Sequence, residues 1–478
     1  MQTNHKSILF LTLFITSFSS CQKLVEVDAP KNAISDKTVF ENDGTAIAVM
    51  NGIYSKMNKM ENGSTSSVTL YAALSADELA LYPGSPDPKI PAYYKNDLNY
   101  NNITSGSIWD GAYNNIYVAN SVLEGMEGSK GLSPAVKVQL SGEAYFIRAL
   151  NYFFLVNLYG NVPLALSTNY AENSALERAP KDKVWNRIEI DLKKAKDLLS
   201  EKFLDGSLLS ESSERVRPSK WTAAAALART YLYMKKYQEA ESASSALIEN
   251  PLFSLEPLDK VFLKNSGECI WSLQPADNGL ASNAEEGRYF ILPAEGPGLA
   301  SGKLYFLSKS FYDLFGNADQ RKYHWINSVT VIENGAPAIY YYPYKYKIGI
   351  EDVPAMEYSQ VFRLAEQYLI RAEARAEQGN FSGAVDDLNQ IRNRAGLSDT
   401  TLSGKQEILD ALMKERRLEL FLEYGHRWLD LKRTNRVDDV MITASILKGG
   451  SWESYKALFP LSGTELKKSL ALKQTEGY

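Results

Sequence analysis

The sequence has few of the residues on which metal binding and nucleophilic catalysis most often depend. Its 478 residues include only three histidines, His5, His324 and His426, and two cysteines. This scarcity excludes a histidine-rich metal site, and a Ser-His-Asp triad would have to use His324 or His426. The chain also contains no G-x-S-x-G, no G-x-x-x-x-G-K-[ST] and no G-x-G-x-x-G motif. We therefore expect no metal, no cofactor and no catalytic residues.

Positive charge is not in excess. Lys and Arg number 52 against 57 Asp and Glu, and the net charge is −5. Recognition of nucleic acid needs a clustered positive field, so nucleic acid is not an expected partner.

Long uninterrupted apolar runs are also scarce. The most apolar internal stretch is 147–166, IRALNYFFLVNLYGNVPLAL, and it contains Arg148, Asn151 and Asn157. A spanning helix needs about 20 predominantly apolar residues. This stretch is therefore predicted to form a helix that is buried nearly all round in a globular core.

The N-terminus carries a short apolar run at 8–15, preceded by Lys6. This pattern predicts a secretory signal peptide over residues 1–20. Small residues before Cys21 are typical of a bacterial lipobox, in which that cysteine is acylated, although Phe18 stands where Leu is usual. The alternative is an ordinary signal peptide with an incidental cysteine. Residues 21–45 then form a lipidated tether.

Helical periodicity dominates the mature chain, and we predict a mostly α fold. It begins near Ala46, and the C-terminus from Thr443 is expected to be irregular. The predicted helices are 108–126, 137–159, 183–202, 218–234, 237–249, 359–378, 382–395 and 405–423.

Two of the predicted helical pairs are similar to each other. Without a gap, Ala228 matches Ala372, Tyr237 matches Phe381, Ala240 matches Ala384 and Leu247 matches Ile391. Small residues where helices cross and an aromatic residue opening the second helix are typical of tetratricopeptide repeats. The alternative is two unrelated amphipathic hairpins. We predict tetratricopeptide-like pairs within 108–159, 183–249 and 359–423, as a scaffold for two long insertions, 61–106 and 250–355.

Aromatic residues are abundant in these insertions, and the whole chain has 29 tyrosines and seven tryptophans. A sugar needs flat apolar faces for its C–H side and short polar groups for its hydroxyls. The first candidate segment is 81–102, which supplies Tyr82, Tyr93, Tyr94, Asp97, Tyr100 and Asn101. The second is RKYHWIN, with Tyr323 and Trp325. For each of these residues, simple packing within a loop is the alternative.

Three further features are interpreted as structural. Tyr340, Tyr342, Tyr344 and Tyr346 alternate, so a strand would place them on one face, where we favour cross-strand packing over ligand stacking. Cys269 is expected to be a buried thiol in a strand. Adjacent acids at 77–78, 285–286 and 386–387 are interpreted as caps, loop bonds or a solvated face, because glycosidase carboxylates must face each other across a substrate.

The chain resembles the SusD/RagB family in five blocks that follow the family's order. They are the lipobox followed by LVEVDAP, the block RALNYFFLVNLYGNVPL, the block RLAEQYLIRAEARAEQGNFSGAVDDLNQIRNRAG, the block KERRLELFLEYGHRWLDLKRTN, and the tail FPLSGTEL…TEGY. The resemblance implies a single α domain over 46–478 in a nutrient-binding lipoprotein on the outer-membrane surface of Bacteroidetes.

The resemblance also implies a partner, a SusC-type TonB-dependent β-barrel transporter, and a nutrient ligand that is often a glycan. Two other functions stay open. A surface-anchored enzyme that degrades glycans would need a carboxylate pair in a groove. A tetratricopeptide adaptor that binds only protein would need a bare concave groove, and the tyrosine-rich insertions count against it.

Overall fold

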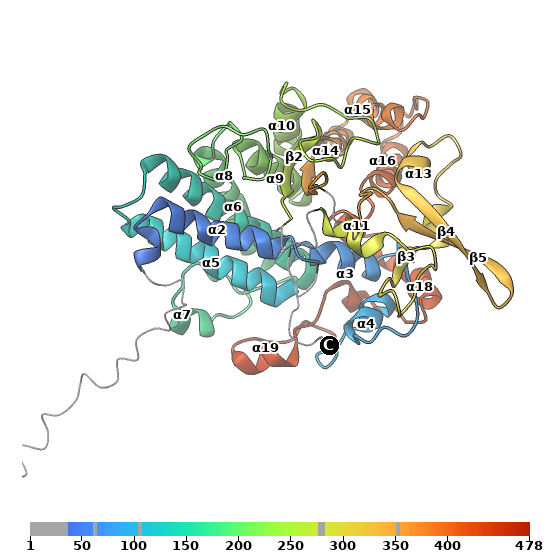
Figure 1. The fold of residues 1–478 in the computed structure, drawn as a ribbon, viewed down its shortest axis with the longest axis horizontal. Helices are drawn as coiled ribbons and strands as arrows, with labels where there is room; N and C mark the ends of the chain where they lie inside the picture. Colours follow the sequence, from blue (N-terminus) through green and yellow to red (C-terminus); the bar gives the residue numbers. More distant parts are fainter. Residues whose placement is uncertain (1–36, 61–64, 104–107, 276–282, 350–353) are drawn as a thin grey trace, which may run out of the picture.

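The computed structural model describes residues 37–60, 65–103, 108–275, 283–349 and 354–478 (Figure 1). The predicted signal peptide, Cys21 and most of the predicted tether lie outside these residues. No helix in the described part combines the length and the apolar character that crossing a membrane requires.

Most of the molecule is an array of helices in which successive members pack against one another (Figure 1). The array confirms the predicted mostly α fold. Its members are α5 (Ile108–Gly128), α6 (Pro134–Tyr159), α8 (Lys181–Leu198), α9 (Lys220–Tyr233), α10 (Tyr237–Ile248), α14 (Leu364–Glu377), α15 (Phe381–Arg394) and α16 (Lys405–Glu419).

Residues 147–159 of the apolar stretch form the C-terminal half of α6, which is buried nearly all round as predicted. Pro134 occupies the first turn, where a missing N–H costs nothing. The helix ends at Gly160, whose φ of 77° and ψ of −121° only glycine adopts without strain.

The two similar helical pairs are neighbours in space, although residues 249–363 separate them in the chain. Helix α10 packs against α14, where Arg375 Nε donates to Glu241 Oε1 over 2.8 Å. The matched alanines are all fully buried, as close helix crossing requires; they are Ala228, Ala372, Ala240 and Ala384. The chain therefore leaves the stack of helices after α10 and rejoins it at α14, and the stack itself is continuous.

The remaining helices are mostly short. They are η2 (Lys37–Phe40), α2 (Asp43–Met57), α3 (Ser67–Ser75), α4 (Lys89–Lys95), α7 (Tyr170–Ser174), α11 (Glu285–Phe290), α12 (Lys309–Tyr312), α13 (Arg321–His324), α17 (His426–Arg433), α18 (Val437–Leu447), η3 (Ser454–Ala457) and α19 (Gly463–Lys468).

The predicted boundaries were wrong at the C-terminal end. The predicted helix 405–423 ends at Glu419, because Leu422 and Tyr424 take positive φ values of 54° and 42° in a tight loop. Helix α18 continues to Leu447 beyond the predicted irregular start at Thr443. Its exposed apolar residues, among them Ile446, hide the amphipathic pattern that would reveal it.

In the described residues, six strands form three antiparallel pairs, all within or beside the insertions. Strand β1 (Leu79–Leu81) pairs with β3 (Tyr305–Leu307), β2 (Cys269–Leu273) with β6 (Ser359–Arg363), and β4 (Ile326–Glu333) with β5 (Ala336–Pro343). Asn334 and Gly335 join β4 to β5 with positive φ at both positions, as a two-residue hairpin requires. The hairpin projects from the helical array (Figure 1).

The predicted strand environment of Cys269 is confirmed, because this residue opens β2 and is buried. Burial raises the pKa of its thiol to about 11.

Buried ion pairs fasten the insertion to the scaffold. Glu419 on α16 accepts from Arg363 on β6 over 2.6 Å and from Arg321 on α13 over 3.1 Å. Arg363 also binds Glu268, at the start of β2, over 2.7 Å. All four side chains are essentially inaccessible to solvent. The mixed charges of the KERRLELFLEYGH block thus join distant segments.

Candidate ligand-binding site

Three half-exposed aromatic rings from separate segments meet at the strand pair β1–β3. We call Tyr82, Phe306 and Tyr340 the inner aromatic surface. Ala80 lies opposite Phe306 in the β1–β3 register, and Tyr82 N donates to Leu304 O over 2.8 Å, so the pairing extends past β1. Tyr82 and Ala80 therefore share the face of Phe306. Tyr340 on β5 meets Phe306 edge to face, with ring centroids 4.8 Å apart.

Polar groups border these rings. The Tyr340 hydroxyl donates to Glu333 Oε1 over 2.7 Å. Partial burial and this bond to a carboxylate raise the pKa of Tyr340 to about 12, so the hydroxyl stays protonated. Ring faces beside a hydroxyl and a carboxylate can take the C–H face and the hydroxyls of a sugar.

A close backbone approach shapes the edge of this surface. Gly84 has a φ of 92°, and a Cβ there would lie 3.1 Å from Leu299 Cδ1. Leu299 belongs to the turn 298–303 that leads into β3, and its side chain is 53% exposed. The Tyr-Pro-Gly turn after β1 therefore fits closely against this turn.

Asp77 fixes the start of β1 against the scaffold. Its two carboxylate oxygens accept from Arg427 over 2.8 and 2.9 Å, and Oδ2 also accepts from Arg417 over 2.8 Å. Burial raises the pKa of Asp77, but these two arginines outweigh burial and lower the pKa below its ordinary value. The adjacent Glu78 is buried, and burial raises its pKa to about 7. The predicted loop bond of this acid pair is thus a clamp on α16 and α17.

The first candidate segment divides between the surface and the core. Tyr82 lies on the inner aromatic surface. Tyr94 on α4 is half-buried, with the Lys448 ammonium 5.3 Å from its ring centroid. The interpretation of Tyr93 as a ligand contact was wrong: it is 1% exposed and stacks on Tyr71 with centroids 4.4 Å apart. Helix α4 turns neighbouring tyrosines in different directions, and only one of them faces the core.

The remaining residues of that segment follow α4. Asp97, Tyr100 and Asn101 are exposed, and Tyr100 retains 53% of its surface. Asn101 N donates to Asn99 Oδ1 over 3.0 Å, which fixes a local turn. Ligand contact by these three residues stays a prediction.

The second candidate segment also has one of its named residues in the core and the other at the surface. Trp325 is fully buried and donates from Nε1 to Leu258 O over 2.8 Å, so its interpretation as a ligand contact was wrong. Tyr323 is 60% exposed, and its hydroxyl donates to Asn317 O over 3.1 Å. Tyr323 stays a predicted contact, on a different segment from the inner aromatic surface.

Two residues of the inner aromatic surface were not selected from the sequence. Phe306 lies in the apolar run LYFL, which carries no polar signal. Tyr340 was noticed, but packing was the preferred interpretation, and it does pack on Phe306. Only the pairing of β1 with β3, more than two hundred residues apart in the chain, brings these rings beside Tyr82.

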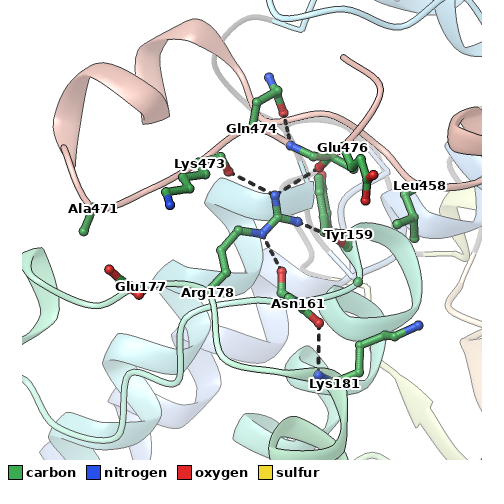
Figure 2. Close-up of a pocket in the computed structure, with 12 residues that line it drawn as sticks. Tyr159, Asn161, Glu177, Arg178, Lys181, Leu458, Ala471, Lys473, Gln474 and Glu476 are labelled. Carbon is green, nitrogen blue, oxygen red and sulfur yellow. Dashed lines mark hydrogen bonds between the residues drawn. The ribbon is translucent and has the colours of Figure 1, made fainter.

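A polar cleft of about 470 Å³ lies where the end of α6 meets the C-terminal tail (Figure 2). Arg178 fills its centre and donates to Asn161 O over 2.6 Å, to Lys473 O over 3.1 Å and also to Tyr159 O. Arg178 also donates to Thr475 Oγ1 over 3.2 Å, so the sequence blocks YGNVP and TEGY meet through one guanidinium. Because its donors bind groups of the chain itself, this cleft is a structural junction.

Among the described residues, no group of three or more His, Cys, Asp or Glu side chains is arranged to hold a metal ion.

The chain is similar to known proteins in both sequence and fold. A family model described as "Starch-binding associating with outer membrane" matches residues 34–232, and the model of the SusD family matches residues 316–478. The SusD-like protein P25 of Formosa agariphila is 25% identical over 503 aligned positions, which cover 91% of each chain.

Solved structures agree. A SusD superfamily protein from Bacteroides vulgatus shares the fold with a TM-score of 0.77 at 21% identity, covering 92% of this chain and all of the other. A laminarin-binding SusD-like protein has a TM-score of 0.74 at 25% identity and covers 91% of this chain and all of its own. The matches extend over both halves of the scaffold and over the insertions between them, and the chain therefore belongs to the SusD/RagB family.

Proposed function

We propose that this protein is a cell-surface lipoprotein that captures an oligosaccharide and delivers it to a SusC-type TonB-dependent transporter in the outer membrane. The observation that carries the proposal is the inner aromatic surface, because it places three rings, a hydroxyl and a carboxylate side by side on the insertions of a SusD-family scaffold. Tyr82, Phe306 and Tyr340 supply the faces on which a sugar ring stacks.

The relatives support a saccharide as the ligand class. One matching family model is described as starch-binding, and the related solved structure is described as laminarin-binding. Both are glucose polymers whose rings present C–H faces. We assign the choice among glycans to residues of the insertions, and the identity of the glycan does not transfer from a relative that is 25% identical.

Anchoring and delivery rest on the N-terminal sequence and the family. Acylation of Cys21 after removal of residues 1–20 would hold the chain at the membrane by the tether 21–45. The matching family model is described as associating with the outer membrane. A protein tethered there lies in the same membrane as the proposed transporter, which favours delivery of the ligand to it.

The acid pairs offered by the sequence have other partners, which disfavours an anchored glycan-cleaving enzyme. Asp77 holds Arg417 and Arg427, as described above. Glu285 accepts from the backbone N–H of Met60 over 2.5 Å. Asp387 accepts from Arg371 over 2.8 and 2.9 Å and also pairs with Arg375 over 2.9 Å, which explains why it is buried on a repeat helix. Each of these carboxylates supports the fold.

The helical stack also disfavours a tetratricopeptide adaptor. Helix α14 is covered by α10 and α15 and is also contacted by α16, so its apolar stripe is used within the chain.

Calorimetric titration of the mature chain with soluble glycans tests the capture proposal, combined with an assay of newly formed reducing ends. We expect saturable heat with at least one glycan and no increase in reducing ends. Turnover of the glycan would favour the enzyme, and the absence of heat with every glycan tested would overturn the proposal.

The transporter partner is tested separately by affinity purification of a tagged chain from outer membranes in mild detergent. We expect a large β-barrel protein to co-purify. Its absence, with the lipoprotein itself recovered from the membrane, would contradict delivery and leave glycan capture standing.

A further inference from the structure

A second aromatic cluster lies on the other face of the β4–β5 hairpin. Side chains alternate along β5, so Tyr340 points to Phe306 and Tyr341 points to the opposite side. There the Tyr341 ring stacks on Tyr312 of α12, with centroids 3.5 Å apart and planes 12° from parallel. We call Tyr312, Tyr341, Lys309 and Lys322 the outer hairpin surface.

The stacked pair is ordered without a ligand. Tyr312 closes α12, whose first turn is capped by Ser308 Oγ accepting from Phe311 N over 3.2 Å. Tyr341 is held by the hairpin on one side and by the Tyr312 ring on the other. Both tyrosines are half-exposed, so Tyr341 presents an already immobilised ring to solvent. A rigid aromatic platform costs little conformational entropy when it binds.

The surface is basic. The Lys322 ammonium lies 4.7 Å from the centroid of the Tyr312 ring and donates to Phe315 O over 3.3 Å. Among the described residues no carboxylate lies within ion-pair distance of it. Lys309 pairs with Asp313 over 2.6 Å, but both groups are largely exposed. The cluster therefore keeps one uncompensated positive charge beside the stacked rings.

The charges of both lysines also act on Tyr341. Burial and the neighbouring Tyr312 raise the pKa of Tyr341, whereas Lys309 and Lys322 act in the opposite direction.

An apolar strip continues from the stack toward the hairpin tip. Ile339 is 54% exposed and shares the face of Tyr341, two residues away. Ile332 lies opposite Pro337 on the same face and is 71% exposed. Aromatic and aliphatic contacts in a line beside a cation suit a chain-like ligand with apolar faces and negative groups.

We propose that the outer hairpin surface is a second saccharide-binding surface, selective for oligosaccharides that carry carboxylate or sulfate groups. The Tyr341 ring stacks on the C–H face of a sugar, and Lys322 pairs with the acidic substituent. The inference rests on the proposed capture of saccharides and adds the charge class of the ligand and a site separate from the inner aromatic surface.

Titration of the mature chain with a galacturonate hexasaccharide, a sulfated carrageenan hexasaccharide and the neutral maltohexaose tests this inference. We expect at least one acidic probe to bind, and its affinity to fall about tenfold or more in Tyr341→Ala and in Lys322→Gln. Raising NaCl from about 0.05 M to about 0.5 M should weaken binding of the acidic probe and leave any binding of maltohexaose unchanged. The uronate and the sulfate arms distinguish the two sources of negative charge.

Matched variants remove the same kinds of side chain away from both aromatic surfaces. Tyr170→Ala removes an exposed tyrosine on α7, and Lys467→Gln removes an exposed lysine on α19. Both should retain salt-sensitive binding of the acidic probe. Equal losses in Tyr170→Ala and Tyr341→Ala, or binding of neither acidic probe while maltohexaose binds, would overturn the inference and leave glycan capture standing. No binding of any glycan, here and in the wider panel, would overturn both.

Binding of a protein at the outer hairpin surface would give a different result. If Tyr341→Ala and Lys322→Gln lose the co-purifying β-barrel but bind all saccharides as wild type does, the outer hairpin surface is a docking face for protein and the inference is wrong.

Discussion

Single carboxylates, most of them buried, hold the inserted segments of this protein in place. Substitution of Asp77 tests this role. Its side chain is 14% accessible and binds two arginines on different helices. Removing one partner of a buried pair leaves the other charges uncompensated. We expect Asp77→Ala to lower the free energy of unfolding by about 2–4 kcal/mol in urea denaturation.

Asp313→Ala is the matched control, because Asp313 forms an exposed pair with Lys309. Such pairs contribute about 0–1 kcal/mol. Equal losses for the two variants would contradict the clamp assigned to Asp77.

Glu286 provides a pH-dependent test. It is buried, it accepts from Ser359 Oγ over 2.5 Å, and burial raises its pKa from 4.5 to about 7. Between about pH 4.5 and about pH 7 the folded chain holds a proton that the unfolded chain releases. This contribution to stability is complete below about pH 4.5 and is lost as the pH rises through about 7, with an upper limit of about 3 kcal/mol.

Glu286→Gln is neutral at every pH, so it should lack this dependence. We expect the variant to gain stability over wild type at about pH 8 relative to about pH 5, measured by urea denaturation at each pH. The same wild-type-to-variant difference at both values would rule out a titrating Glu286.

At the scale of elements, helix periodicity predicted the repeat scaffold well. The alanines at helix crossings identified the two similar pairs, because a fixed spacing of small residues is a local property of the sequence. The interpretation of Tyr93 and Trp325 as ligand contacts was wrong. The direction of a side chain on a short helix, or just after one, depends on partners such as Tyr71 and Leu258, which are far away in the chain. The candidate site residue Phe306 was missed, and Tyr340 was interpreted only as a packing residue, because strand pairing over long separations leaves no local pattern.

The junction between α6 and the C-terminal tail is an element-scale prediction. Arg178→Met removes the donors to Asn161 O and Lys473 O, and it also removes the donor to the carbonyl of the buried residue Tyr159. We expect a loss of about 1–3 kcal/mol in stability and faster amide hydrogen exchange in the tail 471–478. Lys181→Met, at the exposed edge of the same cleft, should change neither quantity. Unchanged exchange in Arg178→Met would show that the tail is held by other contacts.

At the scale of the whole molecule, the proposed capture at the cell surface requires the predicted lipid anchor at Cys21, which precedes the described residues. Cys21→Ala should abolish incorporation of labelled palmitate and release the protein from the membrane fraction, because a single acylated residue is the only predicted attachment. Western blotting of fractionated cells measures the distribution. Retention of the variant in the outer membrane would contradict the lipobox at Cys21.

The whole-molecule claim is that a helical scaffold presents aromatic side chains of its insertions to a saccharide. The measurement that tests it most directly is titration of the tightest-binding neutral glycan into Tyr82→Ala/Tyr340→Ala, with Tyr170→Ala as control because Tyr170 is 82% exposed on α7. We expect the double variant to lose affinity at least about tenfold with its thermal stability retained, and the control to bind as wild type does. Undiminished binding by the double variant would contradict the account.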